Sequence, residues 1–167
     1  MPADSPSILL LMGVSGSGKT TIGKRLADQL GWPYFEADDF HSEANKEKMG
    51  RGTPLTDEDR VPWLGAIRAK IDECIAQRRS AVFTCSGLKE EYRRILMDGA
   101  PAVTLVYLAG DYETILKRVS QRKDHYMKAD MVKSQFEALE PPTDAITVDI
   151  TRPAEESVAK IRQACGI

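Results

Sequence analysis

A glycine-rich segment near the start of the chain restricts its fold more than any other feature. Residues 13–20 read GVSGSGKT and match the pattern G-x-x-x-x-G-K-[ST] in full. The apolar run 7–12 comes directly before this segment, and residues 20–30 after it repeat apolar side chains at helical spacing. A buried strand, a phosphate-binding loop and a helix are therefore predicted in that order, as found in parallel α/β sheets.

Strand and helix patterns alternate along the rest of the chain. Strands are predicted at residues 7–12, 33–37, 81–85, 102–108 and 146–150. Helices are predicted at residues 20–30, 43–49, 89–97 and 112–119, in a long segment that ends near residue 79, and after residue 153. Pro62 is expected in the first turn of the long helix, where its missing N–H costs little. The predicted fold is α/β, a doubly wound five-stranded parallel sheet, with ligands at the C-terminal ends of the strands.

Length and charge limit the class of protein. The 167 residues suit one domain spanning residues 1–167. The 23 Lys and Arg residues nearly balance the 25 Asp and Glu residues, which argues against nucleic acid or an anionic membrane as the main partner. The first residues lack the positive start of a signal peptide, and the cysteines show no metal-ligand spacing. We therefore expect a cytoplasmic protein with reduced thiols.

The residues of the loop have predicted parts in binding a nucleoside triphosphate. Glycines let the backbone N–H groups close around phosphate oxygens. Lys19 is expected to reach the β- and γ-phosphates as a catalytic cation, and the Thr20 hydroxyl is expected to ligate Mg²⁺. The predicted ATP-binding residues of this segment are Gly13, Val14, Ser15, Gly16, Ser17, Gly18, Lys19, Thr20 and Thr21.

The loop alone does not separate a GTPase, a motor ATPase and a kinase. A GTPase needs an Asn-Lys-x-Asp motif after a late strand, whereas residues 45–48 read NKEK and lie early in the chain. The switch pattern Asp-x-x-Gly occurs only at residues 28–31, at the end of a predicted helix. The chain is also small for a motor ATPase. A kinase of small molecules remains.

Several further segments resemble the gluconokinase family. They are residues 13–21, 36–41 (EADDFH), 45–49 (NKEKM), 52–64 (GTPLTDEDRVPWL), 85–89 (CSGLK) with Tyr92 and Arg93, and 134–141 (SQFEALEP). The similarity covers nearly the whole chain, and residues 52–64 and 134–141 are more diagnostic than the loop. The resemblance implies a fold related to shikimate kinase, ATP and Mg²⁺ as cofactors, D-gluconate as the substrate, 6-phosphogluconate as the product, and a possible homodimer.

An acid must orient the 6-hydroxyl of gluconate and accept its proton. Asp38 follows the second predicted strand, where such a base has to lie, and it is the predicted catalytic acid. The alternative is that Asp38 caps the short helix after it. Glu36 is expected to contact Mg²⁺ through water, with a structural role as the equal alternative.

The remaining candidates for substrate binding lie in the segments that the resemblance covers. Arg60 and Lys89 are predicted to bind the carboxylate of gluconate, because arginine and lysine supply charge-assisted hydrogen bonds. In the alternative interpretation, Arg60 pairs with an acid of its own helix and Lys89 is a surface lysine. His41 and Gln135 are predicted to hydrogen-bond sugar hydroxyls. The alternatives are that His41 is an exposed loop histidine and that Gln135 is an ordinary helix residue.

A basic stretch at about residues 118–133 is predicted to be a lid, and residues 38–62 a substrate-binding segment. Arg118 and Arg122 are four residues apart and share a helix face, from which they are expected to reach the transferring phosphates. The alternative is a solvated basic face. Family likeness and the doubly wound geometry place Arg152 beside the adenine. Two other functions stay open: a kinase of another small acid or polyol such as shikimate, and a nucleotide-binding regulator without catalysis.

Overall fold

The computed structural model describes residues 5–53, 55–121 and 129–167, and its centre is a parallel sheet. The strands are β1 Ile8–Met12, β2 Tyr34–Glu36, β3 Ala81–Thr84, β4 Val103–Ala109 and β5 Ile146–Asp149, in the order β2-β3-β1-β4-β5. The central strand β1 pairs with β3 and β4 in parallel, and all five of its residues are buried. The predicted five-stranded parallel sheet is confirmed.

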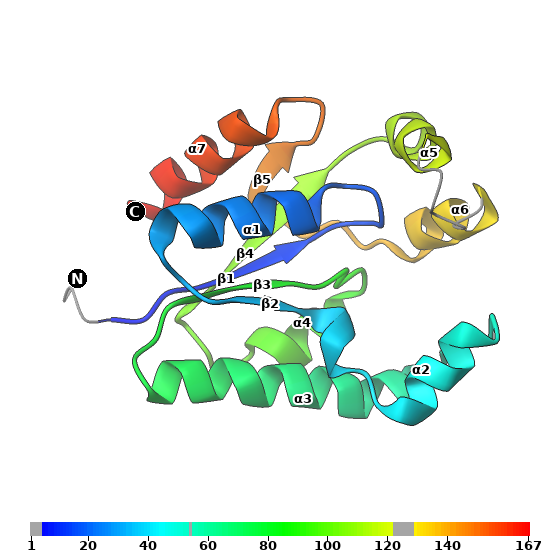
Figure 1. The fold of residues 1–167 in the computed structure, drawn as a ribbon, viewed down its shortest axis with the longest axis horizontal. Helices are drawn as coiled ribbons and strands as arrows, with labels where there is room; N and C mark the ends of the chain where they lie inside the picture. Colours follow the sequence, from blue (N-terminus) through cyan, green and yellow to red (C-terminus); the bar gives the residue numbers. More distant parts are fainter. Residues whose placement is uncertain (1–4, 54, 122–128) are drawn as a thin grey trace.

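Helices cover both faces of this sheet. They are α1 Lys19–Leu30, the short 3₁₀ helix η1 Ala37–Phe40, α2 Glu43–Gly50, α3 Asp57–Ala76, α4 Glu90–Met97, α5 Tyr112–Ser120, α6 Ala129–Ala138 and α7 Ala154–Cys165. Figure 1 shows α1 and α7 over one face and α3 and α4 over the other, with α2 and α6 at the end toward which β1 points. Each face has its own apolar core, because successive residues of a buried strand point to opposite sides.

The long helix α3 begins earlier than the sequence pattern indicated. Thr56 Oγ1 accepts the Asp59 N–H at 3.1 Å, and the Asp59 carboxylate accepts the Thr56 N–H at 2.9 Å. This capping box starts the helix at Asp57. Pro62 therefore lies in the second turn, so its predicted place in the first turn was wrong. The carbonyl of Glu58 consequently has no helical N–H partner at Pro62.

The two ends of the predicted lid are helical. Arg118 belongs to α5, which runs to Ser120, and Lys133 belongs to α6, which begins at Ala129. The prediction that the whole stretch 118–133 lies between structural elements was wrong at both ends, and residues 122–128 lie outside the described residues. Within the described ranges, no helix combines the length and the apolar character that crossing a bilayer requires.

Candidate active site

Three positions of the phosphate loop favour glycine because of their backbone or their surroundings. A Cβ atom at Gly13 would lie 2.6 Å from Ser17 Oγ and 3.1 Å from the carbonyl oxygen of Leu108. Gly16 and Gly18 have φ angles of 86° and 94°, in the left-handed region that favours glycine. The loop ends at the N-terminus of α1, whose first N–H groups have no partner within the helix. This cradle fits the phosphates of a nucleotide.

The side chains of Lys19 and Thr20 make hydrogen bonds to the phosphate loop and to strand β2, respectively. The Lys19 ammonium donates to the carbonyl oxygens of Gly13 at 2.7 Å and Val14 at 3.2 Å. The Thr20 hydroxyl donates to Glu36 Oε1 at 2.6 Å, so the two predicted metal-binding residues are neighbours. A hydroxyl beside a carboxylate suits Mg²⁺. No three His, Cys, Asp or Glu residues gather into a metal site in the part of the chain that the structure describes, so phosphate and water would complete the coordination.

Asp38 lies in η1, directly after β2, and a tryptophan fixes this turn. The indole N–H of Trp63 donates to the carbonyl oxygen of Ala37 at 2.7 Å, and Trp63 is buried in the core beneath it. Trp63 therefore combines core packing with a positioning contact one residue from Asp38, the predicted catalytic acid. Asp38 itself is exposed.

The strand topology puts Asp38 and Lys19 at the same edge of the sheet. The Cys85 thiol lies just after β3, the strand between β2 and β1. Burial raises the pKa of Cys85 to about 11, and the Lys19 ammonium and the Asp38 carboxylate act on this thiol in opposite directions. Strands β1 and β2 both run parallel to β3, Asp38 follows the C-terminal end of β2, and Lys19 follows the loop after the C-terminal end of β1. The structure thus brings the predicted acid to the loop side of the sheet.

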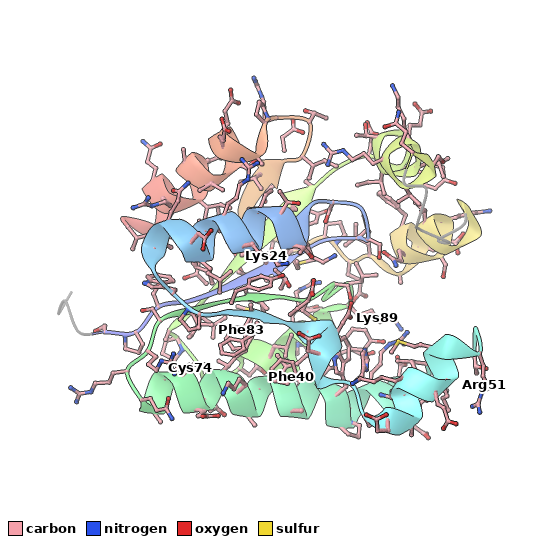
Figure 2. All side chains as sticks on the ribbon, in the orientation of Figure 1. Lys24, Phe40, Arg51, Cys74, Phe83 and Lys89 are labelled. Carbon is pink, nitrogen blue, oxygen red and sulfur yellow. The ribbon has the colours of Figure 1, made fainter. Side chains whose placement is uncertain are left out.

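The two predicted carboxylate-binding residues, Arg60 and Lys89, meet at the ring of Tyr92. The Arg60 guanidinium carbon lies 5.8 Å and Lys89 Nζ 5.6 Å from the ring centroid. Arg60 Nη1 also donates to the Tyr92 hydroxyl at 3.2 Å. Figure 2 shows Lys89 at the end of the sheet toward which β1 points. Two cations from different segments therefore converge where the sequence predicted an anion site.

Asp57 supplies a counter-charge in this cluster. The Tyr92 hydroxyl donates to Asp57 Oδ1 at 2.5 Å, and the same oxygen lies 3.6 Å from Arg60 Nη1 and 3.7 Å from Lys89 Nζ. The hydrogen bond from Tyr92, followed by the two cations, lowers the pKa of Asp57. The alternative pairing of Arg60 with an acid of its own helix is therefore present in the structure. Among Arg60, Lys89 and Asp57, two cations share this one carboxylate.

His41 is not the exposed loop histidine of the alternative reading. It is buried and stacked on Trp63, with ring centroids 4.2 Å apart, and its Nδ1 lies 3.4 Å from Asn45 Nδ2. The Asn45 amide also donates to the carbonyl oxygen of Asp59 at 2.9 Å. Burial lowers the pKa of His41. The structure places this histidine in the packing that joins η1, α2 and α3.

Gln135 contacts the phosphate loop. Its Oε1 accepts the Ser15 N–H at 2.7 Å, and its Nε2 donates to Ser15 Oγ at 2.9 Å. The sequence predicted no role for two residues that contact each other near this segment, Arg93 and Glu140. Buried Arg93 donates to the carbonyl oxygens of Gly87 and Leu88 at 2.7 and 3.1 Å and to that of Glu140 at 2.8 Å. Only the quoted family segments contained a signal for them.

Three more predicted residues belong to the described part of the chain: Arg118, Arg152 and Thr21. Arg118 donates through Nη2 to the carbonyl oxygen of Ile150, next to the turn that contains Arg152. Arg152 and Thr21 are both exposed, the latter on the first turn of α1. Arg122 lies outside the described residues.

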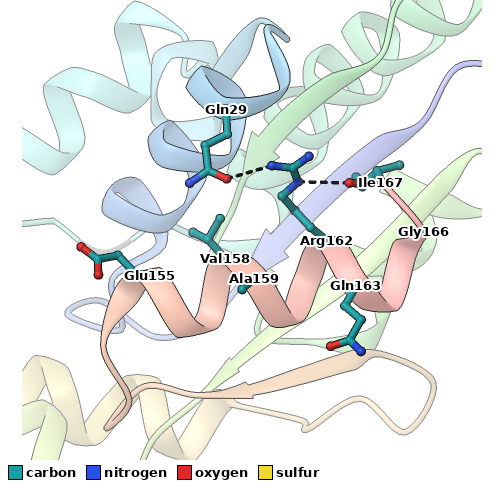
Figure 3. Close-up of a pocket in the computed structure, with 8 residues that line it drawn as sticks. All are labelled: Gln29, Glu155, Val158, Ala159, Arg162, Gln163, Gly166 and Ile167. Carbon is teal, nitrogen blue, oxygen red and sulfur yellow. Dashed lines mark hydrogen bonds between the residues drawn. The ribbon is translucent and has the colours of Figure 1, made fainter.

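A hollow of about 540 Å³ between α1 and α7 is not this site. Figure 3 shows Arg162 in it, bonded to Gln29 Oε1 at 3.0 Å and to the Ile167 carbonyl oxygen at 3.1 Å. No residue of the phosphate loop lines this hollow. Its lining comes from the end of α1, from α7 and from the last two residues of the chain, and includes none of the cations and acids of the candidate active site.

Comparison with known proteins decides the family. Residues 8–142 match a family model described as an AAA domain. The thermosensitive gluconokinase of Escherichia coli K12 is 43% identical over 159 residues, which cover 93% of this chain and 85% of that protein. The chain belongs to the gluconokinase family. The resemblance expected from the sequence segments is thereby confirmed.

Solved structures agree with this family and with the predicted fold. A gluconokinase from Sinorhizobium meliloti 1021 has a TM-score of 0.80 at 38% identity, covering 93% of this chain and 89% of that one. A shikimate kinase from Bacteroides thetaiotaomicron has a TM-score of 0.70 at 18% identity, covering 96% and 99%. The second likeness shows a shared fold alone. It confirms the prediction that the fold is related to that of shikimate kinase.

Proposed function

We propose that this protein is a gluconokinase, which transfers the γ-phosphoryl group of ATP to the 6-hydroxyl of D-gluconate. The observation that carries the proposal is the placement of three elements at one edge of the sheet, in a chain of this family. These elements are a loop that fits a triphosphate, the acid Asp38 after β2, and a cation pair that suits a carboxylate.

Phosphoryl transfer depends mainly on positioning and charge neutralisation. Lys19 exchanges the carbonyl oxygens of Gly13 and Val14 for phosphate oxygens, which are stronger acceptors because they are charged. Asp38 takes the proton of the 6-hydroxyl as that oxygen bonds to the γ-phosphorus. The bond from phosphorus to the bridging oxygen breaks, and its electron pair leaves with ADP.

Thr20 and Glu36 would hold Mg²⁺, Thr20 through its hydroxyl and Glu36 through water. The ion, when bound, neutralises charge on the β- and γ-phosphates. The contact of 2.6 Å between the two side chains supports this assignment, because it puts both oxygens at the mouth of the loop. Arg118 would add positive charge after leaving the Ile150 carbonyl, together with Arg122, as part of a lid over residues 118–133. Arg152 would lie beside the adenine.

The acceptor has its carboxylate and its 6-hydroxyl at opposite ends of a six-carbon chain. Arg60 and Lys89 would anchor the carboxylate, so that the hydroxyl end points toward Asp38. The segment 38–62 would form the wall of this site, with His41 buried inside it. The free cysteines of the described chain agree with a reducing cytoplasm. The homodimer stays a prediction.

The direct test is release of ADP, followed with a coupled assay, in the presence and absence of gluconate. We expect turnover that depends on gluconate and little with shikimate, because shikimate has a ring and no primary hydroxyl. Faster turnover of shikimate or of another polyol would assign a different acceptor. ATP binding without ADP release for any acceptor would assign a regulator and end the kinase proposal.

A further inference from the structure

A short segment joins the phosphate loop to the loop that contains Lys89. It runs from Gln135 in α6 to Glu140 and is called the strap below. Figure 1 shows α6 at the same end of the sheet as the phosphate loop. Gln135 makes two hydrogen bonds to Ser15, although the two residues are 120 positions apart in the chain. The first end of the strap is thus fixed to the nucleotide site.

The other end of the strap is fixed to the acceptor side by three hydrogen bonds to Glu140. Its N–H donates to the Leu88 carbonyl oxygen at 2.7 Å, and its Oε1 accepts the Glu90 N–H at 2.7 Å. Its carbonyl oxygen accepts from Arg93 at 2.8 Å. Glu90 is the first residue of α4, so the Glu140 side chain supplies the capping acceptor that Lys89 at the N-cap does not. Lys89 lies between two residues that the strap contacts.

The middle of the strap is packed against the sheet and against α5. Leu139 packs against the apolar cores of both faces of the sheet. Phe136 makes an edge contact with Tyr112 of α5, with ring centroids 5.6 Å apart. Hydrogen bonds, a helix turn and a packed leucine therefore form a continuous connection from Ser15 to Glu140.

We infer that Gln135 and Glu140 are positioning residues that couple the nucleotide site to the acceptor site. Nucleotide bound in the phosphate loop holds Ser15, Gln135 and the strap in place, and the strap then orders the Lys89 loop for the acceptor. The part that concerns the acceptor rests on the proposed function, because there Lys89 binds the carboxylate. By linkage, acceptor binding strengthens nucleotide binding by the same factor.

The first measurement does not depend on which acceptor is used. Hydrogen exchange of residues 87–92 is followed in the full chain with and without an unreactive ATP analogue. In the wild type, the analogue is expected to slow exchange there by about fivefold or more, the low end of usual coupling. In Gln135→Met, the analogue still binds but this protection is lost. Met has nearly the helix propensity of Gln, so α6 is retained. Equal protection in the wild type and in Gln135→Met would overturn the proposal.

The second measurement is the affinity for the ATP analogue with and without saturating gluconate. The wild type is expected to gain about fivefold or more, and Gln135→Met and Glu140→Ala less than about twofold each. The double variant should be no worse than either, because both residues belong to one connection. Glu140→Gln keeps the oxygen that accepts the Glu90 N–H, so this variant should keep the coupling of the wild type. Glu137→Met, an exposed change on the same helix, serves as the control.

The outcomes separate the two proposals. If the wild type releases no ADP with gluconate, the proposed function fails, and the exchange measurement still decides the strap. If it turns gluconate over but shows no coupling, or if the two single variants reduce coupling additively, the strap is refuted while the kinase stands.

Discussion

Replacement of Arg60 by methionine tests the anion site most sharply. Met keeps an unbranched apolar chain that can pack on the Tyr92 ring, and it removes the charge and the hydrogen bond to Tyr92. A hydrogen bond to a charged group contributes about 1.5–3 kcal/mol, and the Arg60 side chain is 32% exposed, which favours the lower half of this range. About 1.5–2 kcal/mol corresponds to a rise of about 10–30-fold in KM for gluconate.

The assay is ADP release at saturating ATP, with gluconate varied. The KM for ATP should change little, because Arg60 does not contact the phosphate loop. The matched control is Arg94→Met, which removes an exposed arginine of α4 that pairs with Glu90. A KM for gluconate in Arg60→Met within twofold of the wild-type value would refute the assignment of the carboxylate site.

Three further predictions concern the loop, the turn of Asp38 and the buried histidine. Lys19→Ala should release no ADP and keep the far-ultraviolet circular dichroism of the wild type, because the ammonium acts on phosphates; retained turnover would contradict its role. Trp63→Phe leaves the Ala37 carbonyl without its buried partner, so it should cost about 1–3 kcal/mol, or about 2–12 °C in Tm by calorimetry, and lower kcat. Burial lowers the pKa of His41 below its ordinary 6.5, because the folded protein favours the neutral ring. The folded state therefore has its full free energy of unfolding from this residue above pH 6.5, and this contribution is lost as the pH falls through the lowered pKa. Urea unfolding from pH 7.5 to 5 should therefore show a smaller loss of stability in His41→Phe; equal losses would contradict this.

Much of the fold follows from local patterns. The motif at residues 13–20 requires a strand before it and a helix after it. The four other predicted strands are each present in the sheet. Errors arose where one side chain overrides the pattern. The capping box between Thr56 and Asp59 starts α3 before the apolar stripe that starts at Trp63, and this moved Pro62 into the second turn.

The site could be predicted only in part. The loop residues were predicted from the motif, Asp38 from its position at a strand end, and Arg60 and Lys89 from the family segments and the chemistry of a carboxylate site. The contacts of Gln135 with Ser15 and of Tyr92 with Asp57 join residues far apart in the chain. Such contacts depend on how helices pack on the sheet, which no local pattern contains.

One measurement tests the central claim directly: the kcat of Asp38→Asn against that of Asp39→Asn. The two acids are adjacent in η1 and both are exposed, so the pair separates a specific base from the general charge of the turn. We expect Asp38→Asn to lose about 10²–10⁴-fold in kcat with unchanged ATP affinity, and Asp39→Asn to keep near wild-type turnover. Wild-type kcat in Asp38→Asn would show that Asp38 is not the base.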